Sequence, residues 1–454
     1  MNFLFIIGLG FGANYFQHDL YSLSSYQSNA EPFNFPEDDT LRLVAIMAQF
    51  QIEYPDNNPK TSGNGQFLSG EAEEYNNFIE SEIPRCEGFL VDRPPHDLSY
   101  FKEQLRAVGN YYVDVSDSNL FHTVDIILNS NSPGNGYYTV ANEMEYYAKG
   151  DALLAEFFSE ALDLSISDMS AYFDGKEFTP DDVVFVVFHA GLSQDFSYPS
   201  LDPTIYDLKS AYIDEEMMQG VSPAVISGES IYTGILLPET QNMIYFNVVE
   251  DIFGNPDYDM DDLCDIQMGM TGILAMLLGY ELGLPPMFDT ETGNPRVGYF
   301  GLMDHGSNNG RGVIPAKPTP WTRIKAGWSE EININPLDDL DSILINFHEN
   351  IDIIYKINID ADEYFLIENR NNWVFSEADI DSLRRKNKID DNQLGHWFDT
   401  VIEEFTDSQI QIDENTSIIT VFDHYDYGLP GSGIIIWHIK EPDEALISLG
   451  INND

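Results

Sequence analysis

The sequence is poor in basic side chains. It has 21 Lys and Arg against 77 Asp and Glu, which gives a formal net charge of −56 over 454 residues. Phosphate backbones and anionic membrane surfaces repel such a chain, so the composition argues against binding to nucleic acid or acidic lipid. Two interpretations of the charge remain open, and they can coexist. One is solubility in a salty medium, and the other is calcium binding by acidic loops.

Cysteine is scarce as well. The chain has two, Cys86 and Cys264, and they form neither a CxxC motif nor a zinc-finger spacing. They would pair only in an oxidising compartment, and the sequence leaves open whether they do.

The chain also lacks an apolar run long enough to cross a bilayer, so we do not expect an integral membrane protein. The N-terminal run, residues 3–13, resembles the apolar core of a secretory signal peptide. No basic residue precedes it, because the first one is Arg42. Either the signal is atypical or the natural start lies upstream. We predict a signal peptide at residues 1–13, a leader or linker at 14–40, and a secreted or cell-surface protein.

Two common enzyme signatures are missing. There is no GxxxxGK[ST] phosphate loop and no GxSxG nucleophile elbow. Nothing points to a Ser-His-Asp triad, although the order of a triad along the chain varies between folds. What is present is an apolar share of 43%, with 13% aromatic residues, which is typical of a globular protein with large cores and many strands.

Hydrophobic periodicity predicts a mixed α+β fold. Continuous apolar stretches from Leu41 and at 181–191 are typical of strands covered on both faces, and residues 122–128 form a shorter strand. After about residue 335, short alternating segments predict a β-rich unit. Apolar residues at helical spacing predict three helices, at 97–116, 141–163 and 268–283.

The stretch MLLGYELGLPPMFD, residues 276–289, is notable for what it lacks. Zinc peptidases place two histidines at positions i and i+4 of one helix, so that both imidazoles face one ion. A glutamate beside the first histidine takes a proton from the metal-bound water. Here a helix runs into a glycine turn at Gly283, as in that motif, but the histidines and the glutamate are absent.

Several segments in series resemble secreted metallopeptidases of the immune inhibitor A family. GYELGLPPMFD, from Gly279 on, is similar to the glycine-turn half of the family's zinc motif. VGYFGLMDHGSNNG resembles the segment that places a methionine, here Met303, under the metal. Five further segments resemble other blocks of the family: PPHDLSYFKEQLRAVGNYY (94–112), FHAGLSQDFS (188–197), PTPWTRIKAGW (318–328), EYFLIENRN (363–371) and GLPGSGIIIWHI (428–439).

The resemblance implies a fold. We expect a zincin-like metallopeptidase domain at residues 41–334, built around a buried central helix. A β-rich domain at 335–454 would follow, and the resemblance implies that it continues beyond the last residue.

The resemblance also implies a site, and every position in it departs from the family pattern. The two histidines are replaced by Met276 and Tyr280, the glutamate by Leu277 and the acidic third ligand by Pro286. A thioether suits zinc poorly among carboxylates and imidazoles, leucine accepts no proton, and proline has no ligating side-chain atom. We therefore expect no zinc. We also expect apolar packing in its place, since that removes the cost of leaving buried ligands unsatisfied.

Other residues are candidate metal ligands. His189 ends a predicted strand, where a histidine bonded locally to the backbone is the more common explanation. His305 lies near the lost site and would bind a metal together with Asp289 and Asp304, although carboxylates at such positions also cap turns. Neither histidine has a second histidine four residues away.

An acidic loop offers a second kind of site. Asp195, Asp202 and Asp207 could supply oxygen ligands to calcium, but their spacing does not match an EF-hand, and a solvated acidic face is the competing explanation. Calcium is therefore a candidate ligand and zinc is not.

These observations lead to three hypotheses. The first is a secreted, non-catalytic metallopeptidase relative that binds a peptide or protein. The second is an active metalloendopeptidase with a non-standard ligand set. The third is a decayed gene without a selected function.

Overall fold

The computed structural model of the chain describes most residues between 39 and 441. The predicted signal peptide, most of the leader and both cysteines lie outside the described residues. Those described are 39–53, 60–75, 88–196, 204–245, 267–335, 353–375 and 409–441, apart from 73, 133, 177 and 291, together with Phe33, Phe35, Ala378, Asp379 and Phe405.

The fold is mixed α and β, with several sheets, and its largest sheet has six strands in the order β2-β1-β4-β8-β5, with β3 also beside β1. Strand β1 runs parallel to β2, β3 and β4, and β4 runs parallel to β8, whereas β5 is antiparallel to β8. The carboxyl ends of β1, β4 and β8 therefore meet at one edge of the sheet. The strands are β1 (Thr40–Gln49), β2 (Phe121–Ile126), β3 (Tyr138–Thr139), β4 (Val183–His189), β5 (Ala211–Ile213) and β8 (Gly234–Pro238).

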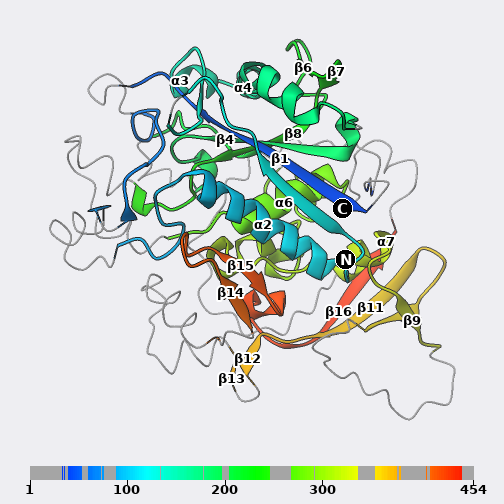
Figure 1. The fold of residues 1–454 in the computed structure, drawn as a ribbon. Coiled ribbons are helices and arrows are strands. Elements are labelled where there is room, and N and C mark those ends of the chain that lie inside the picture. Colours follow the sequence, from blue (N-terminus) through cyan, green and yellow to red (C-terminus); the bar gives the residue numbers. More distant parts are fainter. Residues whose placement is uncertain are drawn as a thin grey trace.

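Helices cover both faces of this sheet. In Figure 1, α4 lies on one side of it, and α2 and α6 lie on the other. Every residue of β4 is buried for this reason, which explains its continuous apolar sequence. The helices are α2 (Leu98–Val115), α3 (Met144–Tyr147), α4 (Asp151–Phe173), α6 (Thr271–Glu281) and α7 (Pro320–Lys325).

The structure agrees with one of the three predicted helices and changes the bounds of the other two. Helix α2 agrees with the prediction for 97–116, and the Asp97 side chain caps it by accepting from the Ser99 and Tyr100 N–H groups. Helix α6 is shorter at both ends than predicted. The single helix predicted at 141–163 is wrong: α3 and α4 are separate, since Gly150 has φ 133°, and α4 continues to Phe173.

The C-terminal part contains a four-stranded sheet in the order β16-β11-β10-β9, at the lower right of Figure 1. Its strands are β9 (Glu331–Asn333), β10 (Ile354–Asn358), β11 (Glu363–Arg370) and β16 (Gly433–Lys440). The described residues also form three two-stranded sheets: β6 (Ala224–Ile226) with β7 (Glu229–Ile231), β12 (Trp373–Phe375) with β13 (Ala378–Asp379), and β14 (Ile410–Ile412) with β15 (Ile419–Phe422).

Residues on both sides of the boundary predicted at residue 335 contribute to one core. The Asn110 side chain on α2 donates to the Thr420 carbonyl on β15, at 2.9 Å. The rings of Tyr111 and Tyr425 meet edge to face, with their centroids 4.8 Å apart. The small β14–β15 hairpin is thus packed on α2 rather than on the four-stranded sheet alone.

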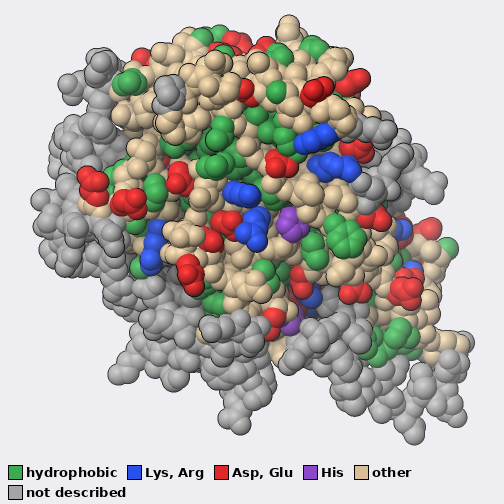
Figure 2. Space-filling model, viewed as in Figure 1, with side chains coloured by type: hydrophobic (Ala, Val, Ile, Leu, Met, Phe, Trp, Pro, Cys, Tyr) green, Lys and Arg blue, Asp and Glu red, His purple; other side chains and the backbone are tan. Residues whose placement is uncertain are grey.

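The described surface fits the acidic composition. Acidic side chains are scattered over the face seen in Figure 2 rather than gathered in one patch. Of the described helices, none has both the length and the apolar character that a membrane span requires.

Candidate functional site

Helix α6 carries the motif positions and is buried along almost its whole length. Met276, Leu277 and Tyr280 are each 0% exposed. The Tyr280 ring lies near the ring of Tyr212 on β5, with centroids 6.4 Å apart. The helix is therefore packed all round, as its sequence predicts, and apolar or aromatic side chains occupy the positions at which the family's ligands would stand.

The glycine turn after α6 is present as predicted. Gly283 has φ 70°, and its N–H donates to the Tyr280 carbonyl while the Leu284 N–H donates to the Gly279 carbonyl. These two bonds close the helix in a Schellman motif, which needs a left-handed residue at this position. Pro286 beyond this turn is buried, and its side chain offers no metal ligand.

Met303 packs directly against the helix. A Cβ atom added to Gly279 would lie 2.6 Å from the Met303 sulfur. The Met303 carbonyl also accepts the Met287 N–H, at 2.8 Å, so the chain beyond the turn returns to the same place. This methionine acts in packing.

The carboxylates of Asp289 and Asp304, which the sequence analysis proposed as metal ligands, already have partners. Asp304 is fully buried, and one of its oxygens accepts the N–H groups of Arg296, Val297 and Gly298, each at 2.8 Å. Its other oxygen accepts the His305 N–H at 2.7 Å. The Arg296 side chain in turn donates to Asp289 at 2.6 Å. Asp304 thus holds this loop through its backbone N–H groups, and Asp289 holds it through the Arg296 side chain.

Burial shifts the pKa values of the neighbouring side chains Asp304 and His305 in opposite directions. It raises the pKa of the Asp304 carboxyl, against the opposing effect of the backbone donors. Burial lowers the pKa of His305, against the attraction of Asp304. The His305 ring lies beside Tyr299, with centroids 5.7 Å apart.

His189 is a fully buried histidine at the end of β4. Its Nδ1 atom lies 3.0 Å from the Ala190 carbonyl oxygen, which is the local backbone contact weighed from the sequence. Burial lowers its pKa to about 4, so the ring is neutral at physiological pH. The rings of Phe50 and Phe157 lie 6.0 and 6.2 Å from it. Within the part of the chain that the structure describes, its Nε2 atom has no hydrogen-bond partner.

Two of the three acidic residues proposed for calcium, Asp195 and Asp207, are buried rather than solvated. Asp195 accepts the Ser210 N–H at 3.0 Å and the Gln241 side-chain amide at 2.8 Å. Asp207 accepts the Ser62 N–H at 2.6 Å. Asp202 lies outside the described residues. Among the described residues, no three His, Cys, Asp or Glu side chains form a group suited to a metal ion.

A buried polar cluster lies at the carboxyl edge of the six-stranded sheet, and the sequence analysis singled out only two of its members, His189 and Asp195. We call it the strand-end cluster and define it as His96, His189, Asp195, Glu239 and Gln241, all of which are buried. His189 ends β4, and Glu239 follows β8 directly. Ligands in parallel sheets often bind at this edge. The signal in the sequence was a polar run, ETQN, directly after the apolar strand GILLP.

Two more buried acids border this cluster. Glu53 follows β1, accepts the Met144 N–H at 2.7 Å, and has its pKa raised by burial. Asp92 accepts the Gln104 side-chain amide at 2.7 Å. Burial raises its pKa to about 6, although Gln104 and His96 oppose the rise.

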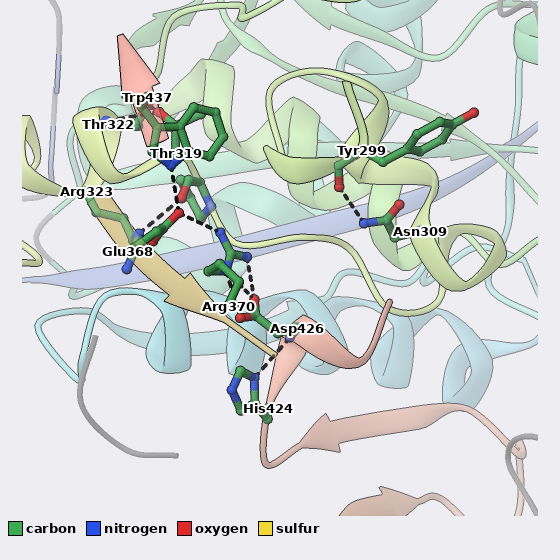
Figure 3. Close-up of polar contacts among 11 residues, drawn as sticks. Tyr299, Asn309, Thr319, Thr322, Arg323, Glu368, Arg370, His424, Asp426 and Trp437 are labelled. Atoms are coloured by element: carbon green, nitrogen blue, oxygen red, sulfur yellow. Dashed lines mark hydrogen bonds and ion pairs between the residues drawn. The ribbon is translucent and has the colours of Figure 1, made fainter. Parts of the chain in front are cut away.

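A second buried charge network joins α7 to the four-stranded sheet (Figure 3). Arg323 donates to Glu368 at 2.5 Å, and Trp437 donates to the same carboxylate at 3.0 Å. Arg370 binds Asp426 through Nε and Nη2. Burial alone would raise the pKa of the Asp426 carboxyl. The neighbouring Arg370 guanidinium opposes this effect, and the pKa lies below its usual value. A carboxylate balances the positive charge of each arginine, so we assign this network a structural role.

Comparison of the chain with protein-family models gives no match, and neither does comparison with curated proteins.

Proposed function

We propose that the chain is a non-catalytic relative of secreted zinc metallopeptidases that works as a binding or structural module. The observation that best supports this is the packing of α6. Met276, Leu277 and Tyr280 stand where two imidazoles and a carboxylate would be needed, and each is fully buried. None of these side chains is suited to hold zinc among oxygen and nitrogen ligands or to take a proton from water.

The partner in this proposal is a peptide or protein. Strand β5 is the last in the order of the six-stranded sheet, and no described strand pairs with its other edge. Helix α6 lies beside it through the Tyr212–Tyr280 contact. All three residues of β5 are buried, so an extended peptide would add to this edge through main-chain hydrogen bonds only after the segments that cover it move aside.

The test is metal analysis of the purified, unchelated protein together with casein and gelatin cleavage. We expect no stoichiometric zinc and no cleavage. One zinc per chain with chelator-sensitive proteolysis would overturn the proposal in favour of a peptidase with other ligands, such as His189 or His305.

A rebuilt site tests the ancestry. The variant carries Met276→His, Leu277→Glu, Tyr280→His and Pro286→Asp, and the natural chain is its control. We expect it to gain zinc affinity because the Gly283 turn is in place. We also expect it to lose stability without metal, since each unpaired buried polar group costs about 1–3 kcal/mol. A folded variant that binds zinc no better than the natural chain would contradict the resemblance.

Calcium is the one metal that we propose as a ligand of this chain. Sodium chloride should raise the melting temperature by screening a charge of −56. Calcium at equal ionic strength should raise it further if Asp195 and Asp207 contribute to a site. Equal effects of calcium and sodium would exclude that site.

A further inference from the structure

The four-stranded sheet has two apolar faces. An antiparallel sheet with one covered face normally alternates apolar and polar side chains, and the polar ones face water. Strands β10, β11 and β16 are antiparallel, and one face of their sheet is covered by α7. There Ile354, Tyr364 and Leu366 form a buried cluster, and Trp321 and Ile324 pack against it. The opposite face is apolar as well, so it departs from the usual alternation.

Strand register aligns the side chains that point away from α7 in rows. One row crosses the whole sheet and contains Ile436, Ile367, Tyr355 and Ile332, one residue from each strand. We call this surface the outer face. We define it by its apolar residues, which are Ile332, Tyr355, Phe365, Ile367, Ile434 and Ile436.

The outer face is open to solvent and carries little charge. Ile434 and Ile436 are each 57% exposed. The one carboxylate that the four strands place on this face, Glu363, stands opposite Lys440 and lies 2.6 Å from His438 Nε2. Apolar side chains gather at the lower right of Figure 2, where Figure 1 draws this sheet. Contiguous apolar surface of this kind marks a site of protein association.

Charge distinguishes between the possible partners. A cationic partner would find one carboxylate on the outer face, and that carboxylate already has basic neighbours. An acidic partner would be repelled by a chain with a net charge of −56. The surface that fits is itself apolar and nearly uncharged. The outer face of a second copy has this composition, and two sheets can pack face to face with their side chains interdigitated.

We propose that the outer face joins two copies of the chain in a symmetric, sheet-on-sheet dimer. The charges on the rest of the two copies repel each other, and salt shortens the reach of that repulsion to about 8 Å at physiological ionic strength. The dimer therefore becomes stronger as salt rises. This inference goes beyond the proposed function, because the motif positions on α6 take no part in it.

The size of the outer face predicts a weak dimer. Four strands with a spacing of about 4.8 Å, each about six residues long at about 3.3 Å per residue, cover roughly 400 Å² in each copy. Interfaces of this size lie at the low end of specific association, where complexes are transient. The dimer is therefore expected to form at high protein concentration and to separate on dilution.

The first test is the mass of the natural protein in solution, measured by light scattering over a wide range of protein concentration at low and high sodium chloride. We expect one chain on dilution and two at high concentration. The dissociation constant should fall at least about tenfold from low to high salt. A chain that stays monomeric at high concentration and high salt would overturn the proposal and leave the outer face to another partner. A dimer that does not strengthen with salt would also overturn it.

The second test places a charge at the centre of the outer face. Ile436→Lys puts an ammonium group beside Ile367 rather than beside a carboxylate, so the dissociation constant should rise at least about tenfold. The matched control is Ile412→Lys, because Ile412 is 44% exposed and lies on β14, outside the outer face. Both changes are at exposed positions, and melting curves check that both variants fold. Equal dissociation constants for the two variants would overturn the proposal.

A third variant separates packing of faces from pairing of edges. Strand β16 is the last in its sheet, so two copies could also join edge to edge through it. Ile367→Lys changes the same face on β11, one strand away from that edge. Face packing predicts that this variant weakens the dimer as Ile436→Lys does. A dimer that survives Ile367→Lys unchanged would overturn the proposal in favour of edge pairing.

Discussion

Helix α6 and the strand-end cluster are equally buried but opposite in chemistry. The motif positions of α6 hold Met276, Leu277 and Tyr280, whereas the cluster keeps ionisable side chains such as His96 and Glu239 at 0% exposure. In the cluster, the Glu239 carboxylate has a partner for each oxygen. A buried polar group is stable where its partners are complete and costly where they are missing. The comparison indicates that, of these two regions, the strand ends and not α6 are built to hold buried ionisable side chains.

The largest effect is expected where α6 begins. A methyl group at Gly272 would lie 1.8 Å from the Ser307 carbonyl oxygen, which belongs to the backbone and cannot turn away. We expect Gly272→Ala to destabilise the protein by about 4–5 kcal/mol or to prevent folding. The matched control is Gly431→Ala, whose methyl group meets no heavy atom within 4 Å. Similar urea midpoints for the two variants would show that the α6 packing is wrong.

The second prediction concerns the apolar side of the comparison directly. Leu277→Ala removes a side chain that is 0% exposed and should cost about 2–5 kcal/mol in chemical denaturation. Leu164→Ala on α4 makes the same change at a residue that is 45% exposed, and it should cost less than about 1 kcal/mol. A small cost at Leu277 would mean that this helix has space around it, as a functional cleft would require.

The third prediction concerns the polar side. Asp92 has a pKa raised from 3.8 to about 6 by burial, so its charged form destabilises the folded state at neutral pH by about 3 kcal/mol. The folded state binds the Asp92 proton more tightly than the unfolded state does. The stability that this difference contributes is fully present below pH 3.8 and is lost as the pH rises through about 6. Asp92→Asn should therefore stabilise the protein at pH 7.5 by up to this amount, and the gain should shrink toward pH 4.

The matched control for this change is Asp117→Asn. Asp117 also has a positive φ, 54° against 48° for Asp92, but it is exposed. Melting curves at several pH values should show a gain for the Asp92 variant alone. A gain at Asp92 that does not depend on pH would assign the effect to the backbone conformation rather than to charge.

The smallest effect is expected at the exposed pair of His438 and Glu363. Glu363→Gln should change the free energy of unfolding by less than about 1 kcal/mol, because exposed ion pairs are worth little. Urea denaturation at low and high salt measures it. A larger cost would remove the contrast between this pair and the buried pair of His96 and Glu239.

The sequence by itself determined the elements whose signals are local. The continuous apolar run of β4, the helix α2 and the glycine turn at Gly283 each stand where the residues predict them. These features depend on side chains within a few positions of each other, so no distant contact is needed to specify them. The absence of zinc-ligand side chains at Met276, Leu277 and Tyr280 of α6 is likewise a matter of sequence, since it concerns which atoms are present.

Tertiary structure alone decided which polar side chains meet. His96 and Glu239 are 143 residues apart in sequence, and it is the parallel order of β1, β4 and β8 that brings the ends of these strands to one edge. Asp304, a metal candidate in the sequence, instead accepts backbone N–H groups of a loop whose path no local pattern reveals. Partners of this kind are fixed by packing over long sequence separations, so a single sequence shows the groups without showing which of them pair.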